Sequence, residues 1–277
     1  MSEMTSAEKL DHLRELLGEF PSVVVAYSGG ADSAFLADVA HEILGDRALA
    51  VTAVSPSLAP DERDAARKLA SERGWRHSEV ATHELERDEY VRNAPDRCYH
   101  CKTELFETLA TLVAYDGATV LVGTNLDDRS DFRPGQRAAR ERGVRAPMLE
   151  AGMTKDEIRT LSRERGLSTW NKPASACLSS RIAYGVEVTP ARLERVAKAE
   201  AFLRSLGLTE LRVRDHGDLA RIEVPERQIA RLASEEQRSK IAAFLRELGY
   251  LYVTLDLEGF RSGSMNAVLL SIGRREA

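Results

Sequence analysis

The chain has 277 residues, 43% of them hydrophobic and 30% charged, as expected for a globular protein with one large or two ordinary domains. No apolar run approaches the roughly 20 residues that span a bilayer. Residues 1–20 have the pattern of an acidic amphipathic helix and not of a signal peptide, so we expect a cytoplasmic protein without a membrane anchor. The net charge of −5 disfavours a general nucleic-acid surface. An odd number of cysteines, three, disfavours a disulfide framework.

Strands alternate with helices over the first part of the chain. This predicts an α/β fold, with a parallel sheet flanked by helices, over residues 1–185. A loop at 171–185 leads into a smaller α+β domain over 186–277. The predicted strands of the first domain span 23–25, 48–54, 75–80 and 119–122, with a short extended piece at 145–149, and its helices span 6–20, 34–44, 61–73, 102–115 and 154–165. In the second domain we expect a helix at 190–206, a hairpin of strands 211–215 and 220–224, two helices and a last strand at 250–257.

A glycine-rich turn, Ser-Gly-Gly-Ala-Asp-Ser at 28–33, follows the first predicted strand and precedes a helix. Such a turn brings backbone N–H groups close to an oxyanion, which predicts a polyphosphate site. The carboxylate of Asp32 would repel phosphate unless a cation lies between them, so we expect Mg²⁺ there. The alternative is a glycine turn without a ligand. The expected nucleotide contacts are Ser28, Gly29, Gly30, Asp32 and Ser33.

A second polar segment, Gly-Thr-Asn-Leu-Asp-Asp-Arg-Ser-Asp at 123–131, follows the apolar strand 119–122. Ligands of parallel sheets lie at the carboxyl ends of the strands, so this segment is expected beside the glycine turn. Gly123, Thr124 and Asp128 are then candidates for contacts to the nucleotide or its Mg²⁺. An ordinary Asp/Asn turn is the alternative.

Two cysteines, Cys98 and Cys101, lie near the start of a predicted helix, and Cys177 lies in the loop 171–185. Two thiols at this spacing predict a metal, a cluster, a redox pair or two ordinary buried cysteines. Zinc would normally require four ligands. Three cysteines favour a [4Fe–4S] cluster with one open iron. Around Cys177, small and hydroxyl residues predict an accessible sulfur, and Lys172 and Arg181 are candidates to lower its pKa and to bind an anionic substrate. A cysteine packed between two domains is the alternative.

The predicted hairpin places charged residues on one face by strict alternation. Arg212 and Arg214 alternate with apolar residues on one strand, and Arg221 and Glu223 do so on the other. Because neighbouring guanidinium groups repel, a bound phosphate or carboxylate would stabilise this face. A solvated sheet face is the alternative.

Taken together, SGGADS, GTNLDD, DFRPG, KPASACLSSRIAYG and RVRDHGDLARIE resemble the LarE family of ATP-dependent sulfur transferases. The first motif alone resembles the PP-loop of the wider ATP pyrophosphatase superfamily. The resemblance implies adenylation of a carboxylate of pyridinium-3,5-biscarboxylic acid mononucleotide by ATP. Sulfur then replaces the carboxylate oxygen, and the thiocarboxylate product leads to the nickel-pincer cofactor of lactate racemase.

The resemblance also implies roles for individual residues. Cys177 corresponds to a cysteine that gives up its own sulfur in one branch, whereas another branch uses three cysteines, here Cys98, Cys101 and Cys177, to hold a [4Fe–4S] cluster. Further residues implied are Arg212 and Arg214 at the substrate phosphate, and Glu200 and Glu223 at a divalent metal. The expected partners are a sulfide or other sulfur donor, a downstream nickel-inserting cyclometallase, and further copies of the chain in a hexamer.

Three other functions compete with this one. A PP-loop tRNA thiolase with a [4Fe–4S] cluster can combine similar motifs, but it should carry a basic RNA-binding surface. An amide-forming ligase would need no cysteine. A nucleotide-binding regulator would bind ATP without releasing pyrophosphate.

Overall fold

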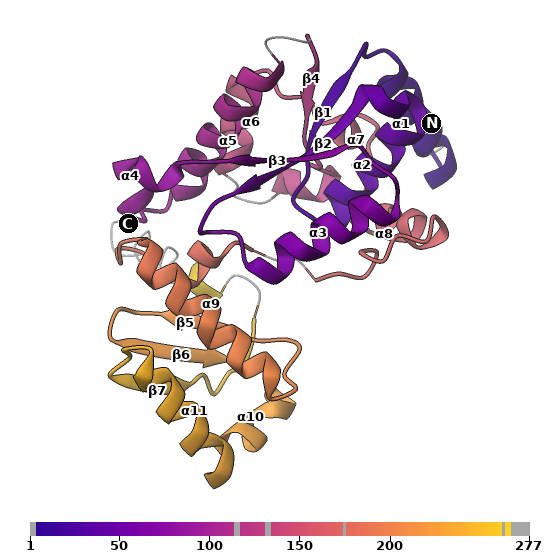
Figure 1. Ribbon diagram of the computed structural model, residues 1–277. Coiled ribbons are helices and arrows are strands. Elements are labelled where there is room, and N and C mark those ends of the chain that lie inside the picture. The colour runs from indigo at the N-terminus through magenta and orange to yellow at the C-terminus, as the bar shows by residue number, and fades with distance from the viewer. Residues whose placement is uncertain (1–3, 114–116, 131–133, 174–175, 262–263, 267–277) are drawn as a thin grey trace, which may run out of the picture. The chain divides into compact units, whose positions relative to one another are not determined.

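The computed structural model describes residues 4–113, 117–130, 134–173, 176–261 and 264–266. The chain folds into two compact units (Figure 1). The first comprises Met1–Glu84 and Cys98–Ser175, and the second comprises Leu85–Arg97 and Ala176–Ala277. Among the described residues, no helix is both long enough and apolar enough to cross a membrane.

A four-stranded, all-parallel sheet forms the centre of the first unit, in the order β3 (His77–Ala81), β2 (Ala48–Val54), β1 (Val23–Ala26), β4 (Thr119–Leu121). The β-branched run at 23–25 suits a strand covered on both faces. Val23 and Val25 pack into one core and Val24 into the other. The predicted α/β fold is confirmed.

Helices cover both faces of this sheet. The core that contains Val23 also includes residues of α1 (Ser6–Gly18), α2 (Ala31–Leu44), α3 (Pro60–Glu72) and α8 (Lys155–Glu164). The core that contains Val24 includes α5 (Arg97–Val113) and α6 (Pro134–Glu141). Figure 1 shows α5 and α6 on one side of the sheet and α1, α2 and α8 on the other. The loops after the strands are thereby held between two rigid layers.

Three predicted segments differ from the structure. The piece 145–149 is not extended: only Arg145 bridges to Leu121, and Pro147 starts the short helix α7 (Pro147–Glu150), as its fixed φ favours. Helix α2 begins at Ala31, so Asp32 lies in its first turn. Helix α5 begins at Arg97, so both Cys98 and Cys101 are helical. The capping box at the start of α8 is confirmed, because Thr154 and Glu157 bond each other's backbone.

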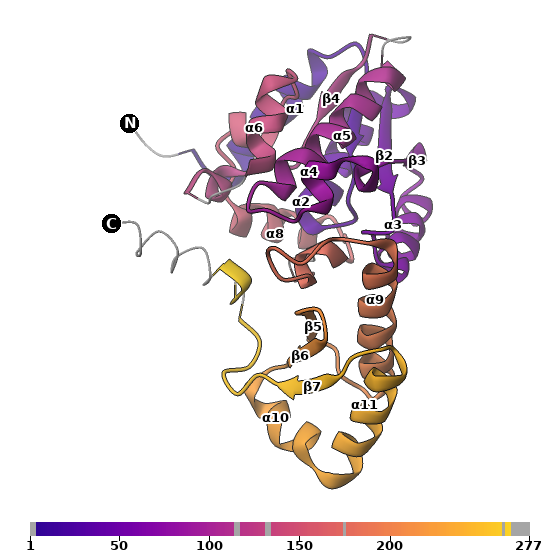
Figure 2. The same ribbon diagram turned by 90° about the vertical axis from the view of Figure 1, so that its left-hand side faces the viewer.

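The second unit has a three-stranded sheet in the order β5 (Arg212–Asp215), β6 (Leu219–Glu223), β7 (Tyr252–Leu255). The first two strands form the predicted antiparallel hairpin, and β7 runs parallel to β6. The apolar side of this sheet packs with α9 (Pro190–Ser205), α10 (Glu226–Ala233) and α11 (Glu235–Glu247) (Figure 2). The opposite side is left for the charged residues of the hairpin.

A segment before α5 belongs to the second unit, although it is remote in sequence. It contains α4 (Asp88–Val91) and Asn93, whose side-chain amide donates to the carbonyls of Ile182, Ala183 and Val186 at 3.3, 2.8 and 2.8 Å. The structure therefore divides the chain after Ser175, ten residues before the expected boundary at 185, and adds residues 85–97 to the second unit. The short 3-10 helices are Gly45–Arg47, Glu84–Glu86, Leu126–Ser130, Leu178–Arg181 and Ser264–Asn266.

Candidate functional site

The order in which strands are added to the sheet of the first unit reverses between β1 and β4. From β1 the chain proceeds outward to β2 and β3, and then returns to add β4 on the other side of β1. Ligands of open parallel sheets bind at the carboxyl ends of the strands at such a switch point. A pocket of about 390 Å³ lies there. Seven of the predicted nucleotide contacts line it: Ser28, Gly30, Asp32, Ser33, Gly123, Thr124 and Asp128.

The turn after β1 is held by its two serines. The Ser28 and Ser33 hydroxyl oxygens are 3.1 Å apart, and the Ser28 backbone N–H donates to Ser33 Oγ at 3.2 Å. Gly29 has φ +72°, a left-handed conformation that favours glycine, although it does not itself line the pocket. Gly30 is the N-cap of α2, and its helix start has no side-chain cap. This leaves a helix N-terminus at the pocket, which suits an anion.

The two carboxylates after β4 have different surroundings. Asp128 lines the pocket and accepts a hydrogen bond from the Asn125 backbone N–H at 3.1 Å. Asp127 accepts from the backbone N–H of Lys155 at 2.6 Å, which caps the start of α8. Asp131, in the same motif, lies outside the described residues. Asp128 therefore lies at the pocket, and its contact with a nucleotide stays a prediction.

None of the three cysteines is in a disulfide; Cys98 and Cys101 belong to the first unit and Cys177 to the second. Cys98 is exposed and lines the pocket of the first unit, and Cys101 follows it on α5. Cys177 is an exposed residue of the second unit, as its neighbours predicted, at the N-cap of the 3-10 helix Leu178–Arg181. Over the ranges that the structure describes, no three His, Cys, Asp or Glu side chains form a group that could hold a metal.

The two cations predicted beside Cys177 make different contacts. Lys172 belongs to the first unit, where its ammonium donates to the Gly29 carbonyl at 2.9 Å and pairs with Glu62 at 2.6 Å. It therefore supports the turn after β1. Ala174 and Ser175, between Lys172 and Cys177, lie outside the described residues.

Arg181 is buried and organises the backbone around Cys177. Its guanidinium donates to the carbonyl oxygens of Ala176 at 2.5 Å and Cys177 at 3.2 Å. The same group pairs with the buried carboxylate of Glu200 at 3.1 Å. Glu200 also accepts the backbone N–H of Val213 at 3.1 Å, so this pair ties the Cys177 turn to strand β5.

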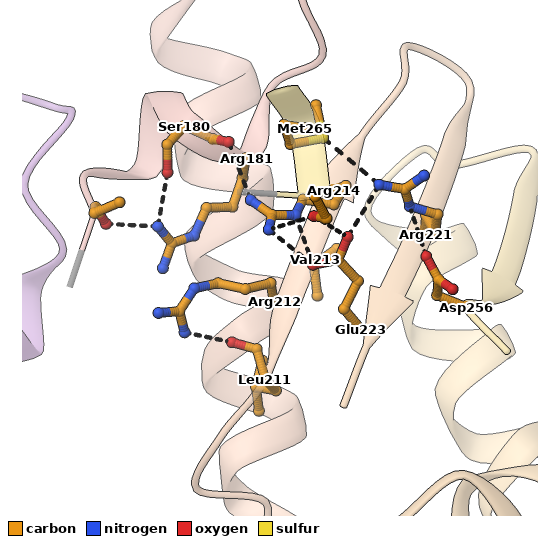
Figure 3. A network of polar contacts seen from close by, with 12 residues as sticks. Ser180, Arg181, Leu211, Arg212, Val213, Arg214, Arg221, Glu223, Asp256 and Met265 are labelled. Carbon is orange, nitrogen blue, oxygen red and sulfur yellow. Dashed lines mark hydrogen bonds and ion pairs between the residues drawn. The ribbon is translucent and has the colours of Figure 1, made fainter. Parts of the chain in front are cut away.

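The charged face of the hairpin is as the alternation predicted. In the β5–β6 register, Arg212 is paired with Glu223 and Arg214 with Arg221. The intervening pair, Val213 and Ile222, is buried in the core. Figure 3 shows the Arg212 and Arg214 side chains next to Arg181, with Arg221 at the far side of Glu223.

These arginines differ in their partners. Arg214 Nε donates to the fully buried Glu223 at 2.9 Å, the same two side chains form an ion pair at 2.8 Å, and Arg221 pairs with the same carboxylate at 3.0 Å. Burial, followed by the charge of Arg181, lowers the pKa of Arg212 to about 10. Arg212 is still cationic at neutral pH, and its position beside Arg181 favours a bound anion (Figure 3).

The two glutamates predicted as metal ligands are both engaged by arginine. Glu200 is held by Arg181 and Arg204, each at 3.1 Å, and Glu223 by Arg214 and Arg221. A divalent cation would have to displace these guanidinium groups, so the carboxylates as arranged do not fit one. Their role as metal ligands stays a prediction.

Comparison with known proteins gives the family. The chain is 40% identical over 267 residues to the pyridinium-3,5-bisthiocarboxylic acid mononucleotide synthase of Lactiplantibacillus plantarum, and the match covers 96% of each chain. The chain belongs to the LarE family. Two further relatives of this chain are uncharacterized proteins. One, of Synechocystis, is 45% identical over 94% of this chain and 98% of its own length. The other, of Methanocaldococcus jannaschii, is 29% identical over 87% of this chain and 91% of its own length. No family model matches.

The motifs that indicated the LarE family fall at two places in the structure. Four residues of SGGADS and three of GTNLDD line the pocket of the first unit. ACLSSR and RVRD form the arginine-lined turn and strand of the second unit. Of DFRPG, Asp131 to Arg133 lie outside the described residues, whereas Pro134 and Gly135 line the pocket. Lys102 and Gln136 also line the pocket, but the sequence did not indicate them as nucleotide contacts. The one hint for Lys102 was its position four residues after Cys98, and Gln136 had none.

Proposed function

We propose that the protein is an ATP-dependent sulfur transferase that converts the carboxylates of pyridinium-3,5-biscarboxylic acid mononucleotide to thiocarboxylates. These serve in synthesis of the nickel-pincer cofactor of lactate racemase. The observation that carries this proposal is the pocket at the switch point, which combines an uncapped helix N-terminus with the carboxylates of Asp32 and Asp128. The name of the Lactiplantibacillus relative, a pyridinium-3,5-bisthiocarboxylic acid mononucleotide synthase, supports the choice of substrate.

The first step uses the pocket of the first unit. A substrate carboxylate oxygen attacks the α-phosphorus of ATP, the bond from that phosphorus to the β-phosphate oxygen breaks, and pyrophosphate leaves. The acyl-adenylate formed has a good leaving group, AMP. Ser28, Gly30 and Ser33 bind the polyphosphate, with Gly29 providing the turn and Gly123 and Thr124 the opposite wall.

A magnesium ion fits this pocket. Mg²⁺ is usually held by one or two carboxylates together with substrate phosphates, and Asp32 and Asp128 supply two carboxylates that line the same pocket. When bound, the ion would neutralise the phosphates and allow them to lie beside these carboxylates.

The second step replaces the activated oxygen by sulfur, with loss of AMP. We include in the proposal a [4Fe–4S] cluster held by Cys98, Cys101 and Cys177, whose three thiols match its soft donor set. When bound, the cluster would supply an exchangeable sulfide. The alternative source is the sulfur of Cys177 itself, which is exposed. In either case Arg181 fixes the backbone on both sides of the Ala176–Cys177 bond.

The substrate phosphate is assigned to the arginine face of the second unit. Arg212 and Arg214 are the proposed ligands, with Arg181 next to them. Arg214 is already paired with Glu223, so Arg212 is the stronger candidate for direct contact.

The family resemblance supports three further parts of the proposal. The protein acts as a hexamer, obtains sulfide or sulfur from a donor, and passes its product to a nickel-inserting cyclometallase. Its use of ATP supports a cytoplasmic location. We assign no nucleic-acid partner, because the net charge of −5 disfavours one.

The test is an anaerobic reaction with ATP, Mg²⁺, sulfide and the dicarboxylate mononucleotide. We expect pyrophosphate release that depends on the mononucleotide, and a product whose mass corresponds to exchange of oxygen for sulfur. Pyrophosphate release stimulated by bulk tRNA and not by the mononucleotide would contradict the proposal in favour of a tRNA thiolase.

A further inference from the structure

The pocket of the first unit has an unusual charge balance for a polyphosphate site. Of the residues that line it, two are carboxylates, Asp32 and Asp128, and within the described part of the chain Lys102 is the one lining residue with a permanent positive charge. Phosphate oxygens beside two carboxylates need more than one cation to be stable in a partly enclosed pocket. Lys102 is thus the feature of the pocket that the motifs leave unexplained.

Helix α5 fixes the position of Lys102. Leu105, Phe106 and Leu109 of this helix are buried in the core with Val24 and Val51 of the sheet. Residues four apart on a helix share a face, and Lys102 lines the pocket together with Cys98 and Phe106, the residues four before and four after it. Leu105 and Phe106 thus anchor this face of α5 in the core, and Lys102 continues the same face at the pocket, about one turn before them.

Gly135 makes room for the stem of this lysine. A Cβ atom at Gly135 would lie 2.8 Å from Lys102 Cγ and 3.5 Å from the Cys98 carbonyl oxygen. Gly135 has no left-handed backbone angle that would itself call for glycine. The lack of a side chain at the start of α6 thus allows the lysine stem to pass along the pocket wall.

Among the described residues, no side chain or carbonyl competes for the ammonium of Lys102. In the part of the chain covered by the structure, no hydrogen bond or ion pair engages it. Lys172, by contrast, is occupied by Glu62 and the Gly29 carbonyl. A lysine that lines the pocket and whose ammonium has no partner among the described residues is available to bind a ligand oxygen.

We propose that Lys102 binds the β- and γ-phosphates of ATP, the part that leaves as pyrophosphate, and that Gly135 positions its side chain for this contact. The inference rests on the proposed function and adds a residue to its nucleotide site. When the bond between the α-phosphorus and the β-phosphate oxygen breaks, the electron pair and negative charge move to the pyrophosphate. A fixed ammonium beside it stabilises that charge.

The test measures equilibrium binding of Mg²⁺–pyrophosphate, Mg²⁺–ATP and AMP by calorimetry. For Lys102→Ala we expect affinity for pyrophosphate and ATP to fall roughly tenfold or more, because a charge-assisted contact is lost. AMP binding should be unchanged. Lys102→Arg should recover part of the loss, and Gly135→Ala, which keeps the charge but displaces the stem, should show a smaller loss. The matched control is Lys68→Ala, on the exposed face of α3, which should behave as wild type.

Two results would overturn the inference while the proposed function stands. One is unchanged pyrophosphate affinity in folded Lys102→Ala protein, with wild-type pyrophosphate release. The other is an equal loss of AMP and pyrophosphate binding, which would move Lys102 away from the leaving group. If the wild type binds neither ATP nor pyrophosphate, both the inference and the proposed function fail. Thermal unfolding identifies variants that do not fold, and Lys102→Gln then takes the place of Lys102→Ala.

Discussion

Gly123 and Ser33 are in backbone contact at the switch point of the sheet. A Cβ atom at Gly123 would lie 2.9 Å from the backbone nitrogen of Ser33 and 3.0 Å from the carbonyl carbon of Asp32. Backbone atoms cannot move aside as a flexible side chain can. The turn after β4 is therefore packed directly against the first turn of α2, which fixes the two walls of the pocket relative to each other.

We predict that Gly123→Ala forces these walls apart. The protein should lose about 1–3 kcal/mol of unfolding free energy through overpacking, and pyrophosphate release should fall roughly a hundredfold, because small displacements in a reacting site are costly. Urea unfolding and a pyrophosphate-release assay measure the two effects. The control is Gly18→Ala, where the nearest atom to the new Cβ is 4.0 Å away. Equal activity of the two variants would show that the contact does not position the site.

Local sequence patterns were sufficient to predict the strands, the hairpin face and the α8 cap. Each depends on neighbours two to four residues apart, as in the alternation around Arg212 and the pair Thr154–Glu157. The patterns did not predict that Lys172 contacts Gly29, which is 143 residues away, or that Asn93 joins the second unit. These contacts are decided by tertiary packing, for which a single sequence carries no local signal.

Asp32→Asn should abolish pyrophosphate release and leave the fold intact. The substitution keeps the shape of the side chain but removes the charge that we assign to Mg²⁺. A carboxylate in the first turn of α2 contributes only about 0.3–1 kcal/mol through the helix dipole, so thermal unfolding should change little. Asp64→Asn, on the exposed side of α3, is the control. Normal pyrophosphate release by the Asp32 variant would remove this residue from the mechanism.

Arg214→Ala should destabilise the protein much more than Arg212→Ala, although the two arginines are two residues apart on the same face. Arg214→Ala removes one of the two guanidinium partners of the fully buried Glu223, and we expect a loss of about 3–5 kcal/mol in unfolding free energy. Arg212→Ala removes one of several neighbouring positive charges, so the loss should not exceed about 1 kcal/mol. Urea unfolding of the two variants measures this difference.

Arg212→Ala should nevertheless weaken binding of the mononucleotide while ATP binding stays at the wild-type level, because Arg212 belongs to the second unit and the nucleotide pocket to the first. Calorimetry with each ligand separates the two affinities. Loss of ATP affinity with retained mononucleotide binding would show that the assignment of the arginine face is wrong.

The sulfur can come from Cys177 itself or from supplied sulfide. If Cys177 attacks the acyl-adenylate, its sulfur forms a thioester with loss of AMP, and elimination then breaks its own Cβ–S bond. The residue left is dehydroalanine, and each chain transfers one sulfur. If sulfide is supplied through a site held by Cys98, Cys101 and Cys177, the polypeptide is unchanged after turnover. We predict the second route, because none of the three cysteines is in a disulfide and one of them, Cys98, lines the nucleotide pocket.

Intact mass after anaerobic turnover with excess sulfide and reconstituted protein distinguishes the routes. We expect several thiocarboxylates per chain, an unchanged polypeptide mass and, in Cys98→Ser protein, loss of turnover with pyrophosphate release retained. The retained release is the control for folding and adenylation, because it requires the pocket but not the thiol. Three results together would instead identify Cys177 as the donor. Each chain would transfer at most one sulfur, the mass at Cys177 would be lower by the elements of hydrogen sulfide, and Cys98→Ser protein would transfer sulfur as well as wild type. In that case Cys98 and Cys101 have no part in sulfur supply.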